Sequence, residues 1–310
     1  MKIKILTVFL VLLSLKGFSQ QELRLTDYKY NMSNINPAYV GTRGTTTIFG
    51  MRKMQWVGIE GAPITNLFSY GTSLKGNKMG LGFTVSNDII GPVTDNRFSV
   101  DYSYAIPLNP KYTLSFGLKA SGNLFNVDFN KLQVGNPGDP ANQNNNGNQF
   151  SPNVGLGLFA FSEKSYLGIS APFILKTVHF DKFASAIEST TNFDSDGLDL
   201  YLSAGHIFDL NESVQLKPSM LIDVAFKNET WVDLSGDFLF NKVVVAGLMY
   251  RPGKAVGLNA GFIYKDSWFF GYDYALETTG LSSTYSGTHV FQLRYEIFPK
   301  NKQVKSPRFF

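Results

Sequence analysis

The chain has 310 residues, no cysteine and a net charge of only +4, and 17% of its residues are charged while 15% are aromatic. Soluble proteins usually carry about 25% charged residues, so this composition indicates an aromatic-rich secreted sandwich or a barrel that faces lipid. It excludes a disulfide framework and a thiolate metal site, it lacks the dense basic tract of a nucleic-acid-binding protein, and a mean hydropathy of -0.06 argues against a bundle of membrane helices.

The first twenty residues, MKIKILTVFLVLLSLKGFSQ, have the pattern of a secretory signal. Two lysines precede an apolar core at 5–15, which is shorter than the roughly 20 residues that a membrane-spanning helix needs. Small residues precede a cleavage site between Ser19 and Gln20. We therefore expect an exported protein in which residues 1–19 are removed and residues 20–44 form a periplasmic N-terminal segment.

Beyond residue 44 the dominant sequence period is two. In RFSVDYSYAI (97–106) and YTLSFGLKAS (112–121), apolar or aromatic residues alternate with small and polar ones. Such alternation places one set on each face of a β-strand, and no stretch competes as an amphipathic helix. The pattern predicts fourteen strands, at 45–56, 64–74, 78–87, 97–106, 112–121, 153–162, 165–176, 197–208, 213–226, 230–240, 243–251, 254–265, 267–276 and 287–298.

The connections between these strands alternate between short and long for much of the chain. Outer-membrane barrels have this layout, with tight periplasmic turns and larger outside loops, and closure of a barrel leaves no unpaired strand edge in lipid. The expected fold is therefore an all-β, antiparallel transmembrane barrel over 45–298, followed by a periplasmic tail at 299–310. A soluble secreted β-protein is the alternative. Expected longer connections lie at 57–63, 88–95, 126–152, 177–196 and 277–287.

The two faces of the predicted strands differ in character. One face carries ionisable and amide side chains that are costly in lipid but acceptable in a polar lumen. These expected lumen residues are Asp101, Lys119, Asp199, Asp233, Asp237, Asp273, Gln292, Arg294 and Glu296. Aromatic residues near strand ends suit interfacial girdles: Trp56, Tyr112, Trp231, Tyr250, Trp268 and Phe298. Glycines in GLGF (80–83) and GLGLF (155–159) are expected to ease strand curvature or packing.

The sequence carries little sign of catalytic or metal chemistry. It has three histidines, with no HxH or HExxH spacing, no GxSxG elbow and no phosphate-binding glycine loop. We expect no enzymatic activity, no metal and no cofactor. Because some barrel enzymes act at the outer rim, His179 beside Asp181 leaves a hydrolase as a minor alternative.

Two N-terminal blocks and the last strand resemble a known family. YKYNMSNINPAYVGTRG (28–44) resembles the Y-x-x-N…NPA-x-x-G start of the PorP/SprF family of Bacteroidota outer-membrane proteins. RKMQWVGIEGAPIT (52–65) resembles that family's R-x-QW…G-x-P-x-T block, and FQLRYEIF its terminal strand. The resemblance singles out candidate partner-binding or structural residues, namely Asn36, Pro37, Tyr39, Gln55, Trp56 and Pro63.

The resemblance implies a role in the type IX secretion system. Such barrels help secrete or retain surface cargo, including adhesins, and serve gliding motility in some members. The implied partners are the C-terminal domain of a secreted surface protein, other secretion components in the periplasm or outer membrane, and outer-membrane lipid, with no nucleic acid. The alternative function is a diffusion channel or small-solute transporter, which lumen charges of both signs would also suit.

The Asn-rich segment NMSNINPAYVGTRG (31–44) precedes the first strand. The ring of Pro37 disfavours a helical backbone at Asn36. Because an even strand number leaves both termini in the periplasm, we expect this segment to pack at or inside the periplasmic mouth as ordered, non-strand structure. Asn side chains would bond the barrel backbone and Tyr39 would fill space. A flexible lead-in is the alternative.

Overall fold

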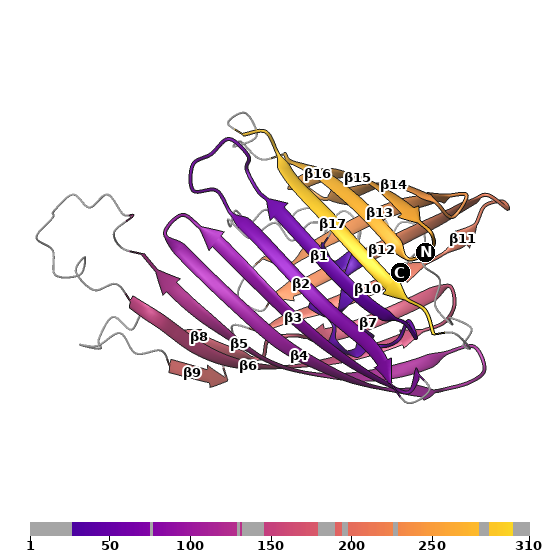
Figure 1. The fold of residues 1–310 in the computed structure, drawn as a ribbon, viewed down its shortest axis with the longest axis horizontal. Helices are drawn as coiled ribbons and strands as arrows, with labels where there is room; N and C mark the ends of the chain where they lie inside the picture. The colour runs from indigo at the N-terminus through magenta and orange to yellow at the C-terminus, as the bar shows by residue number, and fades with distance from the viewer. Residues whose placement is uncertain are drawn as a thin grey trace, which may run out of the picture.

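The computed structural model describes residues 27–74, 77–128, 131, 146–178, 190–193, 198–225, 229–278 and 285–299. Within these residues the chain forms a closed antiparallel β-barrel of fourteen wall strands, in which β1 lies beside β17 and a pairing between β10 and β12 completes the ring (Figure 1). The wall strands are β1 (Thr46–Met54), β2 (Ile64–Leu74), β3 (Met79–Ile90), β4 (Val93–Pro107), β5 (Thr113–Val127), β6 (Asn146–Phe161), β7 (Ser165–Ala171), β10 (Asp199–His206), β12 (Val214–Ala225), β13 (Trp231–Phe240), β14 (Val244–Arg251), β15 (Ala255–Tyr264), β16 (Trp268–Glu277) and β17 (Thr288–Ile297).

The remaining described elements are short. The two-residue strand β11 (Phe208–Asp209) pairs with one end of β12, and β8 (Leu175–Val178) pairs with β9 (Thr190–Phe193) as a separate two-stranded sheet. Ahead of the barrel stand the helix α2 (Asp27–Tyr30) and the 3₁₀ turns η1 (Met32–Asn34) and η2 (Pro37–Tyr39). No helix in the described ranges is long and apolar enough to cross a membrane.

The sequence alternation becomes an apolar outside and a polar inside. In β4, Phe98 and Val100 are 41% and 48% exposed, whereas Ser99 and Asp101 between and beyond them are buried. The same alternation continues around the wall, so large apolar side chains cover the outer surface while ionisable side chains are enclosed. A soluble barrel has the opposite arrangement, and this one is the arrangement of a barrel with an apolar outer band.

The prediction of fourteen strands is confirmed, while some expected boundaries are wrong. The expected longer connection at 88–95 is a two-residue turn, because β3 continues to Ile90 and β4 starts at Val93. Asn87 Nδ2 donates to Asn96 Oδ1 at 2.8 Å, which couples the two strands in their extra length. Strand β7 ends at Ala171 rather than near 176.

The early end of β7 has a local cause in Asn153 on β6. The Asn153 Oδ1 atom accepts hydrogen bonds from the amides of Ile174 and Leu175, at 2.9 and 3.0 Å. Pro172 also has no amide hydrogen with which to continue the ladder. The chain therefore leaves the wall at Pro172 and crosses the inner face of β6, where an added Cβ on Gly155 would lie 2.3 Å from the Pro172 oxygen.

The barrel has two different rims. One rim, called here the tight-turn rim, is where β1 begins and β17 ends, and it carries the turns at 241–242 and 265–267. Asn241 and Lys242 have φ values of 49° and 57°, the two positive values of a type I′ turn. The opposite loop rim carries the connection at 55–63. The strands cross the wall obliquely, and the longest ones, β4 to β6, make one side taller (Figure 1).

Candidate functional site

Residues 27–45, named the plug from here on, fold inside the barrel rather than beside it. Of this segment, Tyr28, Met32, Ile35, Ala38 and Val40 are all almost fully buried. The plug packs on the inner faces of strands from both halves of the wall, because its partners include Leu158 of β6 and Asp237 of β13. It fills the lumen on the side of the tight-turn rim.

The Asn36-Pro37 step sets the local shape of the plug. Asn36 has an extended backbone, with φ −134° and ψ 107°, as the following proline ring requires. Its side-chain Oδ1 accepts a hydrogen bond from the Ala38 amide at 2.9 Å and so caps η2. Pro37 occupies the first position of this turn, where its missing amide hydrogen costs nothing.

Hydrogen bonds join the plug and the wall in both directions. Asn36 Nδ2 of the plug donates to the Leu158 carbonyl of the wall at 3.0 Å, so both ends of this amide are used. In the opposite direction, two wall serines donate to carbonyls of the plug. Ser103 Oγ donates to Val40 O at 2.6 Å, and Ser170 Oγ donates to Ile35 O at 2.8 Å. Buried carbonyls need such partners, so the contact is specific and not only apolar.

Three strand glycines make room for the plug on the inner wall. A Cβ added to Gly80 would lie 2.2 Å from Val40 O, and one added to Gly117 would lie 2.1 Å from Ala38 N. A Cβ added to Gly157 would lie 2.1 Å from Asn36 Oδ1. Glycine within a strand commonly marks the close approach of another backbone. These glycines therefore serve packing against the plug.

Buried ion pairs bind the plug to opposite parts of the wall. Lys29 Nζ lies 2.9 Å from Asp237 Oδ1, and side chains of both residues are at most 2% exposed. Arg43 Nη2 lies 2.7 Å from Glu296 Oε1 near the tight-turn rim. Breaking a buried pair by removing one partner leaves an uncompensated charge, so each pair opposes withdrawal of the plug.

Aromatic packing completes the contact. The Tyr30 ring stacks on Phe269 with centroids 4.7 Å apart, and its hydroxyl accepts a hydrogen bond from Asn259 Nδ2 at 3.0 Å. Tyr39 meets Phe159 edge to face at 5.4 Å. Such pairs contribute about 0.5–1.5 kcal/mol beyond burial of their area.

The structure encloses most of the charged residues expected in the lumen. Asp101 forms an ion pair with Lys119 at 2.9 Å, and Asp233 receives two hydrogen bonds from Arg251, both at 2.7 Å. Gln292 Nε2 donates to Asp273 Oδ2 at 2.5 Å. Buried residues of that set are Asp101, Lys119, Asp233, Asp237, Asp273, Gln292, Arg294 and Glu296, whereas Asp199 is half-buried at the start of β10.

Sequence reasoning did not single out three cations of these networks: Lys29, Arg43 and Arg251. Arg251 could have been found, since it continues the inward-facing register one residue beyond the exposed Tyr250. Lys29 and Arg43 carry no such periodic signal, because they lie outside the strands.

The second family block lies at the loop rim, away from the plug. The backbone N–H of Gln55 donates to the Pro63 carbonyl at 2.9 Å and closes the base of the 55–63 connection. Trp56 Nε1 donates to Glu277 Oε1 at 2.8 Å, which ties this connection to the end of β16. The structure therefore separates Asn36, Pro37 and Tyr39 from Gln55, Trp56 and Pro63.

One girdle assignment is wrong. Trp231 does not face outward, because it is 7% exposed and the Arg251 guanidinium lies 4.0 Å from its ring centroid. The alternation of β13 puts Asp233 and Asp237 inside, and Trp231 shares their face. Register therefore decides the direction of this ring, although its position at a strand end suggests an interface.

A cavity of about 220 Å³ lies above the plug, toward the loop rim. Tyr28, Asn34 and Ile35 of the plug form its floor. Its walls combine apolar, aromatic and charged side chains, including Met51, Lys53, Leu67, Asp88, Tyr201, Leu221 and Trp231. The plug thus fills the lumen toward the tight-turn rim, where cavities of about 40 and 10 Å³ remain, and leaves it hollow toward the loop rim.

Metal chemistry gains no candidate among the described residues. No group of three or more His, Asp or Glu that could hold a metal ion occurs in those ranges. His206 bonds Ser165 at 2.7 Å and links the ends of β10 and β7, and His289 bonds Tyr272 at 2.7 Å. His179 and Asp181, the pair behind the hydrolase alternative, lie outside the described residues.

Solved structures with a similar arrangement are outer-membrane barrels. The CymD monoaromatic hydrocarbon channel has a TM-score of 0.54 at 13% identity, over 87% of this chain and 93% of that one. The Acinetobacter baumannii outer membrane protein Omp33 has a TM-score of 0.47 at 8% identity, over 84% of this chain and 100% of that one. At these identities the likeness concerns the fold alone. No curated protein matches the chain.

The family assignment rests on most of the chain. Residues 17–295 match the family described as type IX secretion system membrane protein PorP/SprF. The match includes the plug, both rims and nearly every wall strand, and family and fold together place the protein in the outer membrane. They are those of a secretion-system barrel or channel and not of an enzyme class. The chain therefore belongs to the PorP/SprF family of type IX secretion system membrane proteins.

Proposed function

We propose that this barrel helps secrete a surface protein and anchors it, by gripping the cargo's C-terminal domain. The observation that carries the proposal is a lumen that the plug fills on the tight-turn side, with the larger cavities among the described residues, of about 220 and 180 Å³, on the side of the loop rim. Loops at one rim and a hollow upper lumen suit the grip on a folded domain, while a bonded plug suits retention better than passage. Family membership supports a role alongside other secretion components.

The proposal assigns each rim to one side of the membrane. Outer-membrane barrels keep tight turns in the periplasm and longer loops outside, so the loop rim and the cavity above the plug face the cell exterior. The apolar outer band, with residues such as Phe83, Leu118 and Leu248 more than 40% exposed, contacts lipid. Other secretion components then meet the tight-turn rim from the periplasm.

Deletion of the gene tests the proposal. Secreted proteins are compared by mass spectrometry in the medium and at the cell surface, and a mild-detergent pull-down of the barrel identifies what co-purifies. Loss of one or a few surface proteins that also co-purify with the barrel is the expected result. If every surface protein is still secreted and retained, the proposal fails. Where the host glides, the same deletion tests whether the cargo serves motility.

The alternative, a diffusion channel, makes a different prediction in planar bilayers. The plug occupies the lumen with buried ion pairs at Lys29 and Arg43, so the anchoring proposal predicts no steady conductance for the wild-type barrel. A stable open pore in the absence of any partner favours the channel. The third possibility, a hydrolase at the rim, predicts that His179→Ala abolishes a measurable lipid or peptide hydrolysis.

A further inference from the structure

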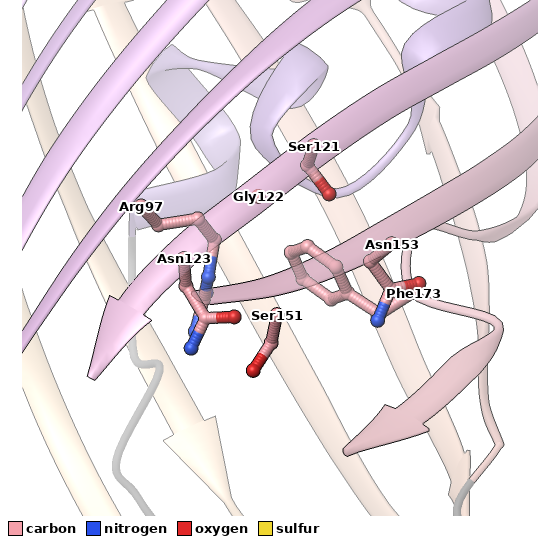
Figure 2. Close-up of a pocket in the computed structure, with 7 residues that line it drawn as sticks. All are labelled: Arg97, Ser121, Gly122, Asn123, Ser151, Asn153 and Phe173. Atoms are coloured by element: carbon pink, nitrogen blue, oxygen red, sulfur yellow. The ribbon is translucent and has the colours of Figure 1, made fainter. Parts of the chain in front are cut away.

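A second cavity, of about 180 Å³, lies inside the taller side of the wall toward the loop rim. Three neighbouring strands line it: Arg97 comes from β4, Ser121 and Asn123 from β5, and Ser151 and Asn153 from β6 (Figure 2). Phe173 lines one side from the segment that follows β7, and in Figure 2 its ring lies among these polar side chains. Arg97 and Phe173 also line the cavity of about 220 Å³, so the two cavities adjoin. The cavity is thus polar around one aromatic ring.

The charges beside this cavity are balanced within the protein. Arg97 Nη2 lies 3.1 Å from Asp95 Oδ2, and Asn123 Nδ2 donates to Asp95 Oδ1 at 3.0 Å. The Arg97 guanidinium also lies 4.7 Å from the Phe173 ring centroid, which fixes it against that wall. A charged ligand would therefore find no uncompensated charge of opposite sign beside the cavity. A neutral ligand would leave the ion pair of Arg97 and Asp95 undisturbed.

Two serine hydroxyls beside the cavity are unsatisfied. The Oγ atoms of Ser121 and Ser151 are buried without a hydrogen-bond partner, and Ser151 is 3% exposed. Each hydroxyl can donate one hydrogen bond and accept two, and leaving such a group unpaired is costly. Asn153 differs because its Oδ1 already accepts from Val154, Ile174 and Leu175. Asn153 therefore holds the segment at 174–175 in place, whereas the hydroxyls of Ser121 and Ser151 remain available to a ligand.

We propose that this cavity binds one pyranose ring of a saccharide. Sugar hydroxyls both donate and accept, as Ser121 and Ser151 do, and they bear no charge that would upset Arg97 and Asp95. The apolar C–H face of the ring packs on Phe173. The volume of about 180 Å³ falls below the roughly 300 Å³ of sites for drug-sized ligands, so it suits a single ring, and any further sugar unit would extend toward the adjoining cavity of about 220 Å³.

The proposal goes beyond cargo anchoring and does not depend on it. The sugar can reach the cavity as a free saccharide or as the terminal unit of a glycan carried by lipopolysaccharide, and both present the same ring chemistry. A carboxylate ligand is disfavoured because it would add a negative charge beside Asp95.

The test uses the full mature chain in lauryldimethylamine oxide micelles, since glucoside and maltoside detergents would compete. Saturation-transfer difference NMR measures binding of the methyl glycosides of glucose, galactose, mannose and N-acetylglucosamine. Core oligosaccharide and intact lipopolysaccharide form the lipid arm. Sodium glutarate and N-acetylglycinamide serve as the carboxylate and amide probes. Binding to the methyl glycosides indicates a soluble source, and binding to lipopolysaccharide alone indicates the lipid-borne one.

Variants link the signal to the cavity. The double variant Ser121→Ala/Ser151→Ala should weaken saccharide binding at least about fivefold, because two hydrogen bonds are lost. Ser115→Ala is the matched control: its hydroxyl is also buried and unpaired on β5, but it does not line the cavity, so binding should not change. Retention of the folded band on unheated gels verifies each barrel. No saccharide signal, stronger binding of glutarate or the amide, or equal binding by the double variant overturns the proposal.

Discussion

Gly117→Ala should disturb the plug without touching the outer surface of the barrel. The added Cβ would lie 2.1 Å from Ala38 N and 2.4 Å from the Pro37 carbonyl carbon. These are backbone atoms, so no side-chain rotation can relieve the overlap. Either β5 and η2 move apart under strain, or the plug leaves its position on the wall.

The two responses have similar energies. Overpacking inside a well-packed interior costs about 1–3 kcal/mol. Local displacement of residues 35–40 instead breaks three of the hydrogen bonds between plug and wall, at Leu158, Ser103 and Ser170, at about 0.5–1.5 kcal/mol each, while the ion pairs of Lys29 and Arg43 stay formed. We therefore expect the free energy of unfolding to fall by about 1–4 kcal/mol. If the plug is displaced, the barrel should also show conductance that the wild type lacks.

Gly236→Ala is the control. Gly236 lies within β13, and a Cβ added there meets no atom within 4 Å, so alanine should be neutral or slightly stabilising. Urea unfolding in detergent, followed by tryptophan fluorescence, gives the free energies, and planar bilayers give the conductance. Equal stability and equal conductance for Gly117→Ala, Gly236→Ala and the wild type would show that the plug does not bear on β5 as described.

Three further changes probe the plug and the tight-turn rim. Asn36→Ala removes the donor to Leu158 O and the cap on Ala38, and it should cost about 1–3 kcal/mol of unfolding free energy; an unchanged urea midpoint would contradict this. Lys29→Met removes the ion pair with Asp237 and should cost about 1.5–3 kcal/mol of unfolding free energy, less than a fully uncompensated charge, because Lys217 pairs opposite Asp237 on the neighbouring strand; an unchanged free energy of unfolding would contradict the importance of the pair. Asp209 lies in β11, outside the wall strands, and hydrogen bonds from Lys164 and Gln215 lower its carboxyl pKa below the usual 3.8. Because the pKa of Asp209 is lower in the folded protein, any stabilisation from this carboxylate is present above about pH 4 and is lost as the pH falls further. Lys164→Ala should raise the Asp209 pKa, which carbon-13 NMR measures. An unchanged pKa would contradict the contact.

The wall could be predicted from the sequence because barrel geometry repeats. Period-two alternation determines which residues face inward, and this rule applies equally to Asp101 in β4 and Asp237 in β13. Strand ends were harder to predict. The side-chain hydrogen bond from Asn87 to Asn96 accompanies the extra length of β3 and β4, and the hydrogen bonds of Asn153 accompany the early end of β7. Both depend on side-chain hydrogen bonds between strands, which a single-strand pattern does not contain.

The position of the plug could be predicted only in part. Asn36-Pro37 excludes a helix through this step, and a segment before the first strand must lie near the rim where that strand begins. The sequence of residues 27–45 alone does not indicate which wall residues they contact, since Lys29 and its partner Asp237 are 208 residues apart. Trp231 is the opposite case. The alternation of β13 correctly places its ring inside the barrel, but its position at a strand end suggested the outer surface.

The inward-facing glycines of the wall connect the pattern of the strands with the position of the plug. Gly117 and Gly157 lie at inward positions of β5 and β6, where an open water-filled lumen would impose no need for a missing side chain, and glycine weakens a strand by about 0.5–1 kcal/mol relative to alanine. The cost is offset only if something must approach the backbone closely there. In this barrel that partner is η2 together with its cap residue: atoms of Asn36 and Ala38 occupy the space of the absent side chains. Inward glycines on adjacent strands, together with an Asn-Pro segment ahead of the first strand, therefore predict a lumen filled by the chain's own N-terminal segment, and Gly117→Ala tests that reasoning directly.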